Sequence, residues 1–137
     1  MSVQHVILAG NSNCRNILSA PQTLTGSWVD IGDAINTMSS YITVWIDLSI
    51  NDSLNVRLRP IAKQESAGDD YVLPIITGAS SLASVDHLGY EFAKDEDQKV
   101  TFSIELVGSI PVVQLQVMAV TPGATPGVIE RIDVSGI

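Results

Sequence analysis

The sequence predicts an all-β protein, an antiparallel β-sandwich of jelly-roll-like form with about eight or nine short strands. Residues 41–50 have an aliphatic side chain at every even position, an unbroken period of two. This alternation places the aliphatic side chains on one face of a strand, whereas a helix would spread them around its circumference. Glycine, proline, asparagine and aspartate divide the chain into short segments, and none has the apolar spacing of a packed helix.

Three further segments repeat the alternation, near 56–58, at 100–106 and at 113–119. Sheets that alternate in this way have one wet face, so two of them must pack together to bury their apolar sides. The residues expected in the core are Ile42, Val44, Ile46, Leu48, Phe102, Ile104, Leu115 and Val117. An eight-stranded closed barrel is the alternative, because its strands show the same alternation.

Weaker signals mark the remaining elements. The candidate strands are 3–8, 28–31, 71–76, 90–93 and 128–134. Segments 33–39 and 80–87 could each form only a turn or two of helix, which is too short for independent stability.

A hairpin is expected between the strands at 41–50 and 56–59. For Ile50 and Val56 to share the core face, its loop must contain roughly three or five residues. On the outer face, Asp47 or Trp45 would then lie opposite Arg57 or Arg59.

Two interpretations fit this outer face. Exposed cross-strand pairs commonly add only about 0.2–1 kcal/mol to sheet stability, and we favour this role. The second interpretation is a contact patch of Tyr41, Trp45, Arg57 and Arg59, because Trp, Tyr and Arg dominate interface hot spots. Apolar residues at sheet edges or in loops are further interface candidates: Ile110, Pro111, Val112 and Ile137.

Length and charge narrow the classes of partner. The chain has 137 residues and is expected to form one domain, 1–137, with residues 1–25 providing an N-terminal arm and the first strand. Its net charge of -8 disfavours binding to nucleic acid or to an anionic membrane surface. The N-terminus has no basic region followed by a long apolar run, so we expect no signal peptide.

The residues required for common catalytic and metal sites are scarce. Cys14 is the single cysteine and there are two histidines, which is too few for a disulfide or a His/Cys zinc cage. No histidine lies near a Gly-x-Ser-x-Gly turn, and the loop 123–127 has no phosphate-binding lysine. We therefore expect no enzyme activity, no catalytic residue, no metal and no cofactor.

Acidic residues in the expected loops raise the question of a Ca²⁺ site. Carboxylates that could offer oxygen ligands to Ca²⁺ occur at Asp30, Asp33, 69–70 and 95–97. Their spacing does not fit an EF-hand, and we favour a role for these aspartates in turns.

Four stretches together resemble small β-sandwich structural proteins of tailed bacteriophage virions. They begin at Gly26-Ser-Trp-Val-Asp-Ile-Gly-Asp-Ala34 and continue with Tyr41-Ile-Thr-Val-Trp-Ile-Asp-Leu48, Ile50-Asn-Asp-Ser53 and Tyr71-Val-Leu-Pro-Ile75. Tyr90-Glu-Phe92, Asp97-Gln-Lys-Val100 and Pro111-Val-Val-Gln-Leu-Gln-Val117 extend the likeness, which spans about residues 26–134.

This resemblance implies a non-enzymatic virion protein, made in the host cytoplasm, that decorates and cements the capsid. The implied partners are the major capsid protein lattice and two further copies of the chain in a homotrimer. High apolar content with few charges also favours a homo-oligomer. The alternatives are a tail or baseplate connector and a carbohydrate-binding or host-adhesion module, for which Trp45 or Trp28 would be the aromatic platform.

Overall fold

The computed structural model describes residues 14–36, 41–62, 71–73, 75–76, 90–92, 98–106 and 112–136. These residues form eleven strands and no helix. Six strands are long: β3 (Val29–Asn36), β4 (Tyr41–Ser49), β5 (Leu54–Ala62), β9 (Gln98–Glu105), β10 (Val112–Thr121) and β11 (Val128–Ser135). Five are short: β1 (Arg15–Asn16), β2 (Gln22–Thr23), β6 (Tyr71–Val72), β7 (Ile75–Ile76) and β8 (Tyr90–Glu91).

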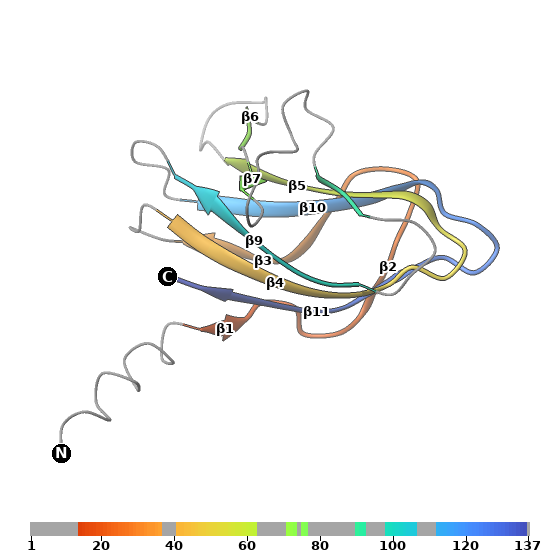
Figure 1. Ribbon diagram of the computed structural model, residues 1–137, viewed down its shortest axis with the longest axis horizontal. Coiled ribbons are helices and arrows are strands. Elements are labelled where there is room, and N and C mark those ends of the chain that lie inside the picture. The colour runs from red at the N-terminus through yellow and green to blue at the C-terminus, as the bar shows by residue number, and fades with distance from the viewer. Residues whose placement is uncertain are drawn as a thin grey trace, which may run out of the picture.

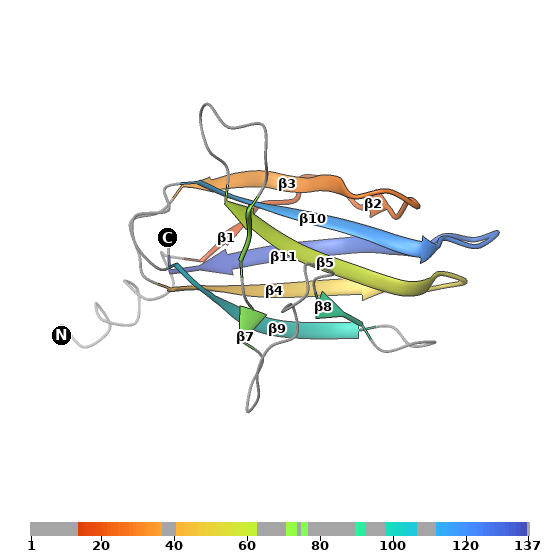
Figure 2. The ribbon, with the colours of Figure 1, turned by 90° about the horizontal axis from the view of Figure 1, so that it is seen from above.

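The strands form two antiparallel sheets that run along the long axis of the molecule (Figures 1 and 2). The six-stranded sheet has the order β1-β11-β4-β9-β7, and β2 also pairs with β11. The five-stranded sheet has the order β3-β10-β5-β6, and β8 also pairs with β5. No ladder joins the two sheets within the described residues, so the architecture is the predicted sandwich and not a closed barrel.

The strand pairing is that of a jelly roll. The first strand pairs with the last (β1 with β11), β3 with β10, β4 with β9, and β5 with β6 and β8. This nested pairing arises when one long antiparallel ribbon wraps around a core. All six long strands consequently alternate between the two sheets in chain order, with β3, β5 and β10 in one sheet and β4, β9 and β11 in the other.

Aliphatic side chains fill the space between the sheets. All eight predicted core residues are buried, none with more than 3% of its surface exposed. The segment before β3 adds Ile17, Leu18 and Leu24 to the same cluster. A core formed from both sheets explains the near absence of polar side chains there, because an unpaired polar group would be costly to bury.

The predicted hairpin between β4 and β5 is wrong. β4 pairs with β9 and β11 in one sheet, whereas β5 pairs with β10, β6 and β8 in the other. Ile50 and Val56 do both face the core, at 2% and 1% exposure, but they do so from opposite sheets. The chain crosses between the layers in a tight turn in which Ser53 N donates to Ile50 O at 3.0 Å.

Hydrogen bonds lock this crossing turn to the loop between β10 and β11, at one end of the sandwich (Figure 1). Ser53 is 1% exposed. Its Oγ donates to Pro122 O at 2.8 Å and accepts from Gly127 N at 2.7 Å. Asp52 adds two bonds, because its N donates to Thr125 O at 3.0 Å and its Oδ2 accepts from Thr125 N at 3.2 Å.

The structure also tests most of the weaker strand and helix predictions. Strands are present at 29–36, 90–91 and 128–135, while the expected strand at 71–76 is two short strands, β6 and β7, in different sheets. Residues 33–36, expected as part of a helical turn, belong to β3. The candidate strand at 3–8 and the candidate helical turn at 80–87 lie outside the described residues.

Candidate interaction surfaces

The outer face of the six-stranded sheet is built from rungs across β11, β4 and β9. In one rung, Trp45 of β4 lies between Asp133 of β11 and Thr101 of β9. In the next, Asp47 lies between Arg131 and Lys99. Alternation explains this face, because the residues between them on each strand point into the core.

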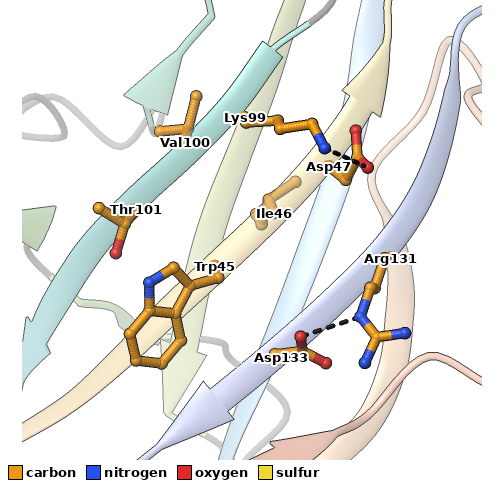
Figure 3. Close-up of a pocket in the computed structure, with 8 residues that line it drawn as sticks. All are labelled: Trp45, Ile46, Asp47, Lys99, Val100, Thr101, Arg131 and Asp133. Atoms are coloured by element: carbon orange, nitrogen blue, oxygen red, sulfur yellow. Dashed lines mark hydrogen bonds and ion pairs between the residues drawn. The ribbon is translucent and has the colours of Figure 1, made fainter.

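These two rungs surround a shallow hollow of about 270 Å³ (Figure 3). Trp45 is 42% exposed, which is unusual for a large aromatic residue in the middle of a central strand. Figure 3 shows its indole between Thr101 and Asp133, with the Asp47 and Lys99 side chains further along the strands. The hollow therefore combines an aromatic surface with polar groups on both sides.

The charged groups of this hollow balance one another. Lys99 Nζ lies 3.6 Å from Asp47 Oδ2, and Arg131 Nε donates to Asp133 Oδ2 at 2.9 Å. The hydrogen bond and the charge of Asp133 raise the pKa of Arg131 above its usual value, so the guanidinium stays charged. Asp133 Oδ1 is shielded from solvent and has no hydrogen-bond partner among the described residues.

The outer face of the five-stranded sheet has a different polar rung, across β3, β10 and β5. Gln116 of β10 is 7% exposed and lies between Asp30 and Arg59. Arg59 Nε donates to Gln116 Oε1 at 2.8 Å, and Gln116 Nε2 donates to Asp30 Oδ1 at 2.9 Å. The rung thus orients the Arg59 guanidinium by a chain of hydrogen bonds.

Arg59 also covers an aromatic ring. Its guanidinium carbon lies 4.3 Å from the centre of the Trp28 ring, a distance at which cation–π attraction is favourable. Nearby on β5, Arg57 Nε donates to Glu91 Oε1 at 3.1 Å, and Asn55 Nδ2 donates to Glu91 Oε2 at 3.0 Å. The three residues Trp28, Arg57 and Arg59 are called the arginine cluster below.

The predicted contact patch is therefore not one surface. Tyr41 and Trp45 lie on the outer face of the six-stranded sheet, whereas Arg57 and Arg59 lie on the outer face of the five-stranded sheet. The prediction failed because β4 and β5 are in different layers. Val112 is half-buried at the start of β10. Ile110, Pro111 and Ile137 lie outside the described residues.

Sequence reasoning missed four residues of the Trp45 hollow: Lys99, Thr101, Arg131 and Asp133. The alternation at 100–106 does predict that Thr101 faces outward. No signal in the sequence, however, indicates that β9 and β11 flank β4, because that choice depends on how the ribbon wraps.

The sequence offered acidic residues as candidate metal ligands and Cys14 as a candidate thiol. The described ranges contain no group of three or more His, Cys, Asp or Glu side chains that could hold a metal ion. Asp30 hydrogen bonds to Gln116, and Cys14 is exposed. Residues 69–70, 95–97 and both histidines lie outside the described residues. Among the residues described, no helix is long and apolar enough to cross a membrane.

No protein-family model matches this chain, and no curated protein matches it either.

Proposed function

We propose that the protein is a non-enzymatic structural component of a virion, a capsid decoration or cement protein that binds the assembled capsid lattice and stabilises it. The observation that supports the proposal most directly is the complete jelly-roll pairing of its strands, an architecture that serves viral capsid proteins among other classes. Because one fold serves many functions, the likeness in architecture is support by analogy. The sequence resemblance to phage virion proteins supports the same role.

The rigidity of the described sandwich suits such a role. Its core is filled from both sheets, and Ser53 and Asp52 tie the loops at one end together. A cement protein that is stiff before docking loses little conformational entropy on binding. The net charge of -8 also disfavours contact with packaged nucleic acid.

We centre the lattice contact on the arginine cluster. Trp and Arg are the residue types most enriched in interface hot spots. Arg59 is held in place by Gln116 and by the Trp28 ring, so its orientation is fixed before binding. A preformed cluster of this kind needs less side-chain ordering when a partner docks.

Co-sedimentation tests the proposal. The purified chain is mixed with capsids of the virus that encodes it, assembled without this protein. Stoichiometric binding and a higher capsid melting temperature are expected. Arg57→Ala combined with Arg59→Ala should weaken binding, while Trp45→Ala, on the opposite face, should not.

Three outcomes contradict parts of the proposal. Absence of binding to capsids together with binding to tails or baseplates would indicate the connector role instead. Binding to none of these particles would remove the virion role. Light scattering is expected to show a homotrimer of the 14.6 kDa chain, and a monomer at micromolar concentration would exclude the trimer.

A further inference from the structure

We propose that the hollow at Trp45 is a second binding site, one that accepts a single pyranose ring of an uncharged saccharide. This inference does not depend on the virion role, because it rests on a different face of the sandwich. It identifies a ligand class by the chemistry of the described residues around the indole.

The first argument is the free aromatic surface. Trp45 is 42% exposed, and no ring contact or hydrogen bond engages its side chain within the part of the chain that is described. The C–H faces of pyranose rings stack on such apolar aromatic surfaces, and the indole N–H stays available for a polar contact. Trp28 differs, because the Arg59 guanidinium already covers its ring at 4.3 Å.

The second argument is the arrangement of hydrogen-bonding groups around the ring. Thr101 and Asp133 lie on either side of Trp45 in the same rung, and Lys99 and Arg131 belong to the next rung (Figure 3). The side chains of Lys99 and Arg131 are 86% and 60% exposed, so their donors can reach a ligand. Sugar hydroxyls both donate and accept, and this mixed rim offers both functions.

The third argument is the balance of charge, which favours an uncharged ligand. Two carboxylates, Asp47 and Asp133, accompany two cations, Lys99 and Arg131. The net charge of the rim is therefore close to zero, and it attracts neither anions nor cations strongly.

The same rim argues against a protein partner at this hollow. Lys and Asp are depleted from the dry centres of protein–protein interfaces, and here they lie one rung from the exposed indole. The arginine cluster on the opposite face has the composition expected of such a centre. We therefore assign the two faces to different ligands.

Size and depth limit the ligand and its affinity. The hollow measures about 270 Å³ and is open to solvent, so it accommodates one ring lying on the indole and not an enclosed oligosaccharide. A ligand with about a dozen non-hydrogen atoms binds a shallow site with a Kd on the order of millimolar. Tighter binding would require several copies of the site acting together.

Two-dimensional ¹H–¹⁵N NMR of the full chain tests this site. The chain has two tryptophans, Trp28 and Trp45, so two indole N–H signals report separately on the two faces. The probes are the methyl pyranosides of glucose, galactose, mannose and N-acetylglucosamine, each titrated to tens of millimolar, about ten times the expected Kd. At least one should shift the Trp45 signal saturably and leave the Trp28 signal unchanged.

Tryptophan variants test whether saccharide binding depends on the Trp45 ring. Trp45→Ala should abolish binding, Trp45→Phe should retain part of it, and Trp28→Phe should leave it intact. The backbone signals of each variant show whether the sandwich is still folded. Glucuronic acid is the charged probe, and it should bind no better than glucose.

Four results would overturn the proposal. These are no Trp45 shift with any probe, equal shifts of both indoles, binding that survives Trp45→Ala, and preference for the charged probe. If Trp45→Ala removes capsid binding while no sugar binds, the hollow is a protein-docking surface instead. Capsid binding that persists with no sugar binding would refute this site and leave the virion role standing.

Discussion

The Arg59 guanidinium stacks on the Trp28 ring at 4.3 Å, on the opposite side of the sandwich from the exposed Trp45. The chain thus has two tryptophans in contrasting settings, one covered by a cation and one open to solvent. This contrast separates the proposed lattice contact from the proposed saccharide site, and it provides matched controls for both.

The Trp28 and Arg59 side chains should be energetically coupled. A double-mutant cycle with Trp28→Ala and Arg59→Ala is expected to give a coupling of about 0.5–2 kcal/mol in the free energy of unfolding. Urea denaturation provides the measurement. Trp45→Ala with Arg59→Ala is the control cycle, which should give no more than about 0.5 kcal/mol because the residues lie on opposite faces.

Ser53→Ala should be more destabilising than an ordinary serine substitution. The Ser53 hydroxyl is buried and bonds to both Pro122 O and Gly127 N, so its removal leaves two backbone groups without their partner. The expected loss is about 1–3 kcal/mol. Ser49→Ala, which removes an exposed bond to Glu130, should cost less than about 0.5 kcal/mol in the same urea experiment. Equal effects would contradict the role assigned to Ser53.

Truncation of buried side chains tests which face of each strand packs into the core. Leu48 and Ile104 are fully buried, so Leu48→Ala or Ile104→Ala is expected to cost about 2–5 kcal/mol. Val120 is 46% exposed, and Val120→Ala should cost less than about 0.5 kcal/mol. Chemical denaturation followed by circular dichroism measures both, and a small loss at either buried site would refute the assigned packing.

Gly32 is required for the close approach between β3 and the segment after β1. Its φ is +73°, and an added Cβ would lie 2.9 Å from Ile17 O. Gly32→Ala is therefore expected to lose about 1–3 kcal/mol, seen as a lower melting temperature. At Gly26 the nearest atom to an added Cβ is 3.7 Å away, so Gly26→Ala should be neutral or slightly stabilising. A reversed order of the two variants would show that the backbone of β3 at Gly32 is not constrained.

Alternation along the chain was enough to predict which residues enter the core. Ile42, Ile46 and Leu48 are buried as expected, because a period of two assigns side chains to faces whatever the neighbouring strand is. The same logic explains why the strands β4 (Tyr41–Ser49), β9 (Gln98–Glu105) and β10 (Val112–Thr121) are found near their predicted positions. Short strands such as β1 and β2 were missed because two residues cannot establish a period.

The candidate site was predicted only in part, and the case of Trp45 shows why. Its exposure follows from alternation, but its neighbours do not. The sequence favoured Arg57 or Arg59 as the facing residues, since β5 follows β4 directly, and the structure has Asp133 and Thr101 there. The actual partner strands come from residues more than fifty positions further along the chain.

The fold class and the inward or outward direction of the side chains could be predicted from the sequence, because both follow from local periodicity and from the hydrophobic effect. The placement of β4 and β5 in different sheets is visible only in the three-dimensional structure. The apolar face of a strand is buried equally well whether the next strand pairs with it in a hairpin or crosses to the opposite sheet. The burial of side chains therefore does not distinguish the two arrangements. The choice depends on how all the strands together enclose one core, and no local pattern records it.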